Sequence, residues 1–157
     1  MESWRTTYAD LLPESYLANL SLKDSESRWR ERLQGDKSSI VCASDHAGRV
    51  VGFAAAGPGR GEAFGEQGWE LYAIYMLQRC QGVGLGRRLF ADALETAGGV
   101  PALTWCLSAN PSRSFYEALG GKPLGTQSVE IGGVKLEETC YGWRDAGELR
   151  RRLRTEC

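Results

Sequence analysis

Residues 69–97 run from a strand pattern through a glycine-rich turn into an amphipathic helix, and this order restricts the fold more than any other feature. After the turn Gln81–Gly86, the apolar residues Leu85, Leu89 and Ala93 recur at helical spacing. A helix that directly follows a strand carries the chain across one face of the sheet to a parallel neighbour. This stretch therefore predicts a mixed α/β architecture.

Side-chain alternation along Trp69–Leu77 predicts the two faces of this strand. One face carries Trp69, Leu71, Ala73 and Tyr75, and the other carries Glu70, Tyr72, Ile74 and Met76. The other predicted strands are Ser39–Ser44, Val50–Ala56, Ala102–Leu107, Gln127–Ile131 and Val134–Trp143. Residues 45–48 and the pair Gly132-Gly133 are good turn sequences and join four of these strands into two hairpins. The sheet is therefore expected to be largely antiparallel.

Helices are predicted on both sides of these strands. The first third carries one helix that includes Trp4 and Tyr8, and a second that is capped by Asp24 or Ser25. A later helix is expected to begin at Asn110, a natural N-cap, and to end at Gly120. The predicted fold is α/β (α+β) in one domain over residues 1–157, with residues 145–157 as a C-terminal helical tail.

Charge and cysteine usage exclude several classes of protein. Nineteen basic and twenty acidic residues give a net charge of −1, whereas a general binder of nucleic acid or membrane surfaces needs a basic excess. The five cysteines are odd in number and form no CxxC pair, which argues against zinc sites and disulfide frameworks. No signal-peptide core opens the chain. We therefore expect a cytoplasmic protein with no metal, nucleic-acid or membrane partner.

The turn Gln81–Gly86 has the chemistry of an anion site. Glycines let the backbone bend tightly and let a ligand approach, and the helix start offers unpaired N–H groups with a partial positive charge. A P-loop needs lysine where Arg87 stands, and a dinucleotide fingerprint needs a third glycine where Leu89 stands. From the residues alone, a phosphate site and a glycine-rich connection without a ligand both remain open.

Three segments carry a resemblance to a known family. Gln81-Gly82-Val83-Gly84-Leu85-Gly86 resembles the Q/R-x-x-G-x-G/A signature of the GNAT superfamily of N-acetyltransferases, and Glu70–Met76 resembles the strand that precedes it. Asn110–Gly120 resembles the family's Asn…Phe-Tyr-Glu-x-x-Gly helix. The resemblance covers roughly Ser3 to Trp143. It implies a mostly antiparallel sheet, flanked by helices and splayed at the cofactor strand.

One departure from the family concerns the start of the sheet. Family members usually begin with a strand before the first helix, and this chain begins with the helix. Either that strand is absent or the chain begins late. If the strand is absent, the next strand presents an unpaired edge, which is a liability for association. A homodimer that completes this edge is therefore one expectation.

The resemblance also implies a cofactor, acetyl-CoA (coenzyme A), and a reaction in which an amine attacks the thioester directly. Backbone groups of Met76 and Leu77 are expected to pair with pantetheine, and N–H groups of the glycine turn to hold the pyrophosphate. The full set of expected cofactor residues is Met76, Leu77, Gln81, Gly82, Val83, Gly84, Leu85, Gly86, Arg87, Arg88, Asn110 and Ser114. For Asn110, a purely structural role as a helix cap is equally open.

Two residues are expected to move protons. Tyr116 matches the family tyrosine that protonates the leaving thiolate, and Glu70 is the candidate base that takes a proton from the ammonium. The alternatives are core packing for Tyr116 and a solvated strand end for Glu70. Trp4 and Tyr8 are expected to line the acceptor cleft.

Two further residues have a structural interpretation, and two functions other than catalysis were considered. His46 lies in a hairpin loop and Cys80 lacks a histidine partner, so both are expected to be structural. The runner-up function is a non-catalytic acyl-CoA sensor of the same fold, and a nucleotide-binding protein is disfavoured because the P-loop lysine is absent. The acceptor stays open among amino acids, polyamines, aminoglycosides, small toxins and peptide N-termini.

Overall fold

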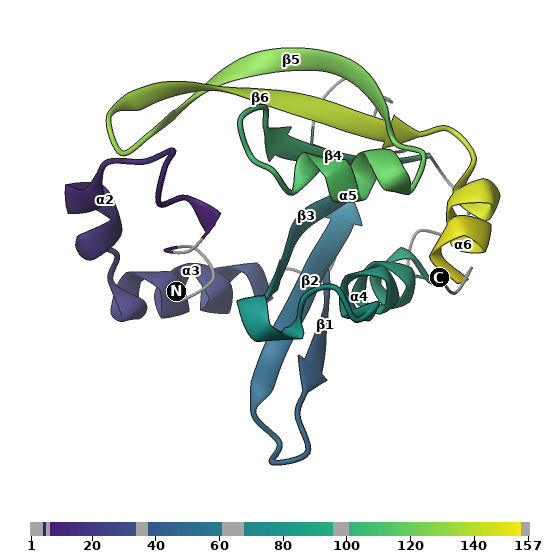
Figure 1. Ribbon diagram of the computed structural model, residues 1–157, viewed down its shortest axis with the longest axis horizontal. Helices are drawn as coiled ribbons and strands as arrows, with labels where there is room; N and C mark the ends of the chain where they lie inside the picture. The colour runs from purple at the N-terminus through teal and green to yellow at the C-terminus, as the bar shows by residue number, and fades with distance from the viewer. Residues whose placement is uncertain (1–4, 6, 34–37, 61–67, 96–100, 155–157) are drawn as a thin grey trace.

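The computed structural model describes residues 5, 7–33, 38–60, 68–95 and 101–154, which form one six-stranded sheet with helices around it (Figure 1). The strands are β1 (Ser39–Ser44), β2 (Val50–Pro58), β3 (Trp69–Met76), β4 (Ala102–Leu107), β5 (Lys122–Ile131) and β6 (Val134–Trp143). The helical elements are α2 (Glu14–Ala18), α3 (Leu22–Leu33), the single turn η1 (Gln78–Cys80), α4 (Leu85–Leu94), α5 (Arg113–Ala118) and α6 (Ala146–Arg154).

The sheet has the order β1-β2-β3-β4-β6-β5, and only the β3–β4 pair is parallel. This confirms the mixed, mostly antiparallel fold and the crossover through α4. The crossover explains the parallel pair, because the chain must return to the same end of the sheet before β4 begins.

Helices cover both faces of the β1–β2–β3 half (Figure 1). On one face, α4 packs on these three strands and on α6, and its Phe90 is fully buried between Trp69 and Trp143. On the other face, the Trp29 ring of α3 meets Phe53 of β2 edge-on, with ring centroids 5.0 Å apart. The main core therefore lies between the sheet and the layer of α4, α5 and α6.

Two predicted boundaries are wrong for identifiable reasons. Helix α3 begins at Leu22, and Oγ of Ser21 accepts a hydrogen bond from the Asp24 amide, so Ser21 is its capping side chain. Strand β5 begins at Lys122, five residues before the predicted start. Its first half is exposed and pairs with β6 through an irregularity between Pro123 and Gly125. The sequence there therefore lacks the apolar alternation that would predict a strand.

A bulge in β3 overturns the predicted alternation of its faces. Ala55 pairs with Ala73 while Ala56 pairs with Leu71, which leaves Tyr72 as an extra residue. Because one residue is inserted, Leu71 and Ile74 both pack on the main core although three positions separate them. The prediction that Ile74 shares a face with Glu70 is therefore wrong.

The sheet splays immediately after this bulge. β3 and β4 pair only over three positions, from Trp69 with Ala102 to Leu71 with Thr104. Beyond them β3 stays with β2, and β4 stays with β6. The two halves of the sheet thus diverge as a fork (Figure 1), which confirms the splay expected at the cofactor strand.

The far end of the β5–β6 hairpin reaches over to α2 (Figure 1). Gly132 and Gly133 form its turn with φ values of +61° and +78°. A Cβ on Gly132 would lie only 2.6 Å from the Tyr16 ring, so the turn rests directly on that side chain. The hairpin and α2 therefore bound the fork on the side opposite α4.

Within the described residues, β1 has one neighbouring strand, β2, and so forms one edge of the sheet. Completion of the edge by a second copy of the chain stays a prediction, and light scattering is the measurement that tests it. In the same ranges, no helix has the length and apolar character needed to cross a bilayer.

Candidate active site

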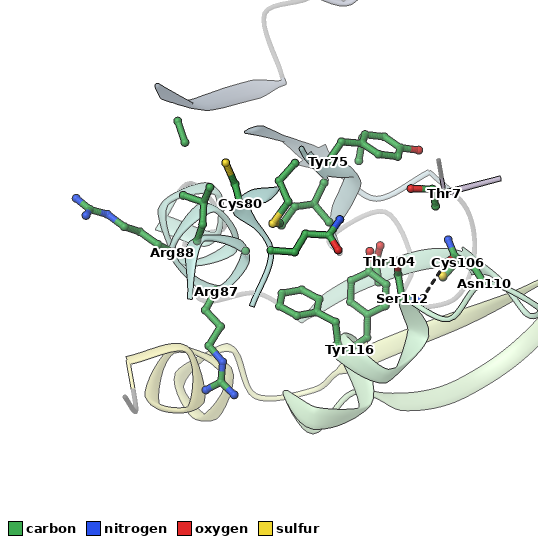
Figure 2. A pocket seen from close by; sticks show the side chains of 18 of the residues that line it. Thr7, Tyr75, Cys80, Arg87, Arg88, Thr104, Cys106, Asn110, Ser112 and Tyr116 are labelled. Carbon is green, nitrogen blue, oxygen red and sulfur yellow. Dashed lines mark hydrogen bonds between the residues drawn. The ribbon is translucent and has the colours of Figure 1, made fainter. Parts of the chain in front are cut away.

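A cleft runs through the fork, and its lining residues include Thr104 and Tyr116 on one wall and Ile74 and Met76 on the other. Its walls come from β3, from the turn that leads into α4, from β4 and from α5, with Tyr8 on the N-terminal side. Figure 2 shows Cys106, Thr104 and Tyr116 facing Tyr75 across this opening. The cleft thus brings together segments that lie far apart in the sequence.

The glycine turn has the geometry of an anion site at the edge of this cleft. Gly82 and Gly84 have φ values of +75° and +81°, which L side chains rarely adopt. The first bond into α4 runs from the Arg88 amide to the Gly84 carbonyl, so the amides of Leu85 and Gly86 have no partner inside the helix. These donors and the positive end of α4 suit a diphosphate.

Gly86 serves the packing of α4 as well. A Cβ there would lie 2.8 Å from Cε of Met76 and 3.4 Å from the Phe115 ring, so a side chain at this position would require the end of the Met76 side chain to move. Figure 2 shows Arg87 and Arg88 projecting in different directions from the helix. Nη1 of Arg87 donates to the Arg152 carbonyl at 3.5 Å, which turns its side chain toward α6.

The backbone of β3 presents Met76 to the open side of the fork but does not present Leu77. The Leu77 amide donates to the Val51 carbonyl at 2.9 Å, and the Leu77 carbonyl accepts from the Cys80 amide at 2.8 Å. The expected pairing of the Leu77 amide with a cofactor therefore conflicts with its bond to β2. Since antiparallel pairs alternate, Ile74 and Met76 are the residues whose backbone groups face away from β2.

Asn110 and Ser114 line the cleft with side chains that already make local bonds. Oδ1 of Asn110 accepts from the Ser112 amide at 2.9 Å, and Oγ of Ser114 donates to the Pro111 carbonyl at 2.9 Å. Helix α5 begins only at Arg113, so Asn110 closes the turn before the helix. This supports the structural reading of Asn110, and a cofactor contact stays a prediction.

Tyr116 is buried at the fork among other aromatic rings. Its ring stacks on Tyr141, with the ring centroids 6.0 Å apart. Burial raises the pKa of Tyr116 well above its ordinary value, and the nearby Cys106 and Tyr75 add to this rise. The phenol is therefore fully protonated at neutral pH and lines the cleft as a proton or hydrogen-bond donor.

The cysteines near the site are free thiols. Cys106 lies beside Tyr116, and burial, reinforced by Glu138, raises the pKa of its thiol to about 11. A thiol of that pKa is almost wholly protonated at neutral pH and is a poor nucleophile. Among the described residues, no group of histidine, cysteine or acidic side chains is arranged to hold a metal ion.

Glu70 is not a solvated strand end, as its alternative reading supposed. Its side chain is only 2% exposed and forms an ion pair with Arg60, whose side chain is 59% exposed. Nη2 of Arg60 donates to Oε1 of Glu70 at 2.7 Å, while the backbone amide and Nε of Arg60 donate to Oε2 at 2.9 and 3.3 Å. Glu70 and Arg60 both line the cleft.

Tyr8 lies where the acceptor cleft was expected. Its hydroxyl is 3.2 Å from that of Tyr75 on β3, and burial raises the pKa of Tyr8. The other expected acceptor residue, Trp4, falls outside the described residues. His46 lies in the β1–β2 hairpin loop, as expected.

Three residues that line the cleft were not predicted as site residues from the sequence: Arg60, Thr104 and Tyr75. Arg60 lies in a glycine-rich stretch that reads as a loop, and its partner Glu70 is ten positions away, beyond any local pattern. Thr104 and Tyr75 look like ordinary strand residues. Thr104 and Tyr75 line a cavity only because β3 splays from β4, and the pattern of a single strand does not predict that splay.

Comparisons with known proteins agree with this geometry. Residues 2–121 match the Acetyltransferase (GNAT) family. Over 154 residues the chain is 40% identical to "Uncharacterized N-acetyltransferase YuaI" of Bacillus subtilis, covering 96% of this chain and 86% of that protein. The fold resembles a phosphinothricin acetyltransferase from Sinorhizobium meliloti solved with AcCoA (TM-score 0.67, 22% identity, 94% and 81% of the two chains).

A second solved structure shares the fold, a PaiA N-acetyltransferase from Thermoplasma acidophilum in complex with coenzyme A. It superposes with a TM-score of 0.60 at 17% identity and covers 88% of this chain and 85% of its own. This second similarity also concerns the fold. From the family match over most of its length and the identity to YuaI, the chain belongs to the GNAT acetyltransferase family.

Proposed function

We propose that this chain transfers an acetyl group from acetyl-CoA to a primary amine of a small molecule or peptide. The observation that carries the proposal is the fork between β3 and β4, which opens directly beside the glycine turn at the start of α4. Acetyl-CoA, when bound, supplies the acetyl group as a reactive thioester. The solved relatives with AcCoA and coenzyme A support this choice of donor.

The chain's own groups divide the binding work. The amides of Leu85 and Gly86 hold the pyrophosphate at the positive end of α4. The backbone of Ile74 and Met76 takes the place of a missing neighbour strand and pairs with the pantetheine arm. A backbone N–H aimed at the thioester oxygen lowers the barrier by about 3 kcal/mol.

Proton transfer falls to one residue on each side of the fork. The acceptor ammonium loses a proton to Oε1 of Glu70, directly or through water, and the freed amine forms the new C–N bond as the C–S bond breaks. The hydroxyl of Tyr116 then donates a proton to the leaving sulfur, and the second proton that the nitrogen loses as the amide forms restores the phenol. Its raised pKa makes Tyr116 a weak acid, so we expect the hydrogen bond to strengthen only as negative charge develops.

A non-catalytic sensor of acyl-CoA is the second candidate, and one specific observation favours it. Both oxygens of Glu70 already accept hydrogen bonds from Arg60, which occupies most of the capacity of the candidate base. In a sensor, this ion pair serves only to close the acceptor side of the cleft.

Calorimetry followed by an amine panel tests the proposal and separates the two candidates. We expect acetyl-CoA to bind with a Kd in the micromolar range and ATP to give no heat. Free coenzyme A release is then followed by a thiol assay with amino acids, diamines, an aminoglycoside and a short peptide. Binding with turnover supports the transferase, binding with no turnover supports the sensor, and no heat with acetyl-CoA overturns both.

A further inference from the structure

We propose that Arg60 is a positioning residue that orients Glu70, so that one lone pair on Oε1 faces the acceptor amine. This inference rests on the proposed function, because it assigns a role within acetyl transfer. Arg60 itself touches no reacting atom in this account. It acts through Glu70.

The hydrogen bonds around Glu70 leave one acceptor position. A carboxylate oxygen can accept about two hydrogen bonds. Oε2 receives two, from the backbone amide and Nε of Arg60, whereas Oε1 receives one, from Nη2. The fork of the guanidinium and its own backbone therefore fix both the place and the rotation of the carboxylate, and Oε1 keeps the remaining capacity.

Arg60 is itself held by groups near the splay. Its guanidinium carbon lies 4.3 Å from the ring centroid of Tyr72, the bulged residue of β3. The backbone beside it is fixed by a bond of 2.8 Å from the Gly59 amide to the Gly68 carbonyl. The hydrogen bond to Glu70 raises the pKa of Arg60 against the opposing effect of burial, and the charges of Glu70, Tyr72 and Glu138 add to the rise, so that Arg60 is charged at every accessible pH.

The burial of the pair argues for a role beyond stability. Glu70 is almost fully buried while Arg60 is more than half exposed, so the carboxylate bears most of the desolvation cost. Buried ion pairs are often no more stabilising than apolar residues of similar volume. A carboxylate kept in the wall of a reactive cleft, with one open acceptor position, is suited to receive a proton.

This arrangement makes the geometry of proton transfer depend on Arg60. The acceptor ammonium gives its proton to Oε1, which later releases it to solvent, and the balance needs no other reactant. Without the guanidinium, the Glu70 side chain can rotate and Oε1 no longer faces the amine reliably. A misplacement of about 1 Å in such a group can lower the rate by about 100-fold.

The test compares R60Q, R60K, E70Q and R60Q/E70Q with the wild type, using the most active amine of the panel above. The control is R49Q, because Arg49 also pairs with a carboxylate, that of Asp45, in the exposed β1–β2 turn. For each protein, acetyl-CoA affinity is measured by calorimetry, and kcat/KM for the amine is measured between pH 6 and 9.5.

We expect R60Q to lower kcat at least tenfold, because the guanidinium no longer holds the Glu70 carboxylate in one orientation. R60K should recover part of the loss, since lysine keeps the charge but not the two-pronged contact. In the E70Q background, R60Q should cause no further loss of kcat. Acetyl-CoA affinity should stay within twofold throughout, and R49Q should match the wild type.

Two results overturn the inference while leaving the proposed function intact. One is a folded R60Q that keeps the wild-type kcat and pH profile. The other is a double variant whose loss of kcat equals the product of the losses in R60Q and E70Q. Such a result would mean that the two residues act independently, whereas the inference requires Arg60 to act through Glu70. Failure of the wild type to turn over any amine counts instead against the proposed function.

Discussion

Oγ1 of Thr104 donates a hydrogen bond of 3.0 Å to the carbonyl of Leu71, at the last position where β3 and β4 pair. Thr104 also lines the cleft together with Tyr116 (Figure 2). One buried side chain thus holds the point where the sheet divides and lies in the same wall as the group that donates a proton in the proposed reaction.

Thr104→Val should therefore affect both stability and catalysis. The substitution keeps the shape of the side chain but leaves the Leu71 carbonyl without this hydrogen-bond donor, at a cost of about 1–3 kcal/mol. Urea denaturation measures the loss of stability, and kcat should fall as well. The control is Thr126→Val on the exposed part of β5. Equal stability of the two variants would show that the Thr104 bond does not hold the fork.

Tyr116→Phe tests the proton donor. We expect kcat to fall by about 100-fold, the low end for general acid catalysis, with acetyl-CoA affinity unchanged. Tyr141→Phe is the matched control, because that ring stacks on Tyr116 and its hydroxyl bonds Glu117. A loss of similar size in both variants would point to packing of the aromatic stack instead.

The pH dependence of the wild type follows from the raised pKa of Tyr116. Since the folded value lies above the ordinary value of about 10, the phenol stays protonated at and below pH 10. Its contribution to stability is complete below that pH and is lost only as pH rises through the folded value. The kcat profile should therefore show no loss from Tyr116 between pH 7 and 10. A loss in this range that disappears in Tyr116→Phe would contradict the assignment.

The glycine turn allows a test with an internal control. Gly84 and Gly48 have nearly the same backbone conformation, φ +81° and +76°, and a Cβ would meet nothing within 4 Å at either position. Alanine should therefore cost about 1–2 kcal/mol of stability at both sites. Only Gly84→Ala should weaken acetyl-CoA binding, by at least tenfold in calorimetry, because Gly84 sets the orientation of the amides at the start of α4. Equal acetyl-CoA affinities of the Gly84→Ala and Gly48→Ala variants would show that the turn is not part of the binding site.

Local patterns in the sequence predicted the elements that form the fork. The glycine turn, the amphipathic helix α4 and the short strand β4 each follow from periodicity and turn chemistry within a few residues. Strand β4 and the Gly132-Gly133 turn lie where the sequence placed them. These features depend on neighbouring residues, so a single sequence contains enough information to find them.

Features that depend on distant contacts were not predicted. The bulge at Tyr72 arises from the pairing of β3 with β2, and the Arg60–Glu70 ion pair joins a loop to a strand. The hydrogen bond from the Leu77 amide to the Val51 carbonyl likewise follows from strand register. Periodicity within one strand carries no information about its partner, which is why the faces of β3 were misassigned.

The contact between the β5–β6 turn and α2 permits the last test. Gly132 and Gly133 both have positive φ, so alanine strains the backbone at each, but only a Cβ on Gly132 would meet another side chain, Tyr16. We expect Gly132→Ala to lose about 1–3 kcal/mol more than Gly133→Ala in urea denaturation, the usual cost of overpacking. Tyr16→Ala should abolish this difference, because it removes the ring that the new methyl group strikes.

The same substitutions report on the acceptor side of the cleft. If the turn and α2 bound the space that an amine enters, Gly132→Ala should raise KM for the amine while leaving acetyl-CoA affinity unchanged, since the glycine turn lies on the other side of the fork. Gly133→Ala should change neither quantity. An unchanged KM in a Gly132→Ala protein that has lost the expected stability would mean that the hairpin closes the fold there without shaping the acceptor site.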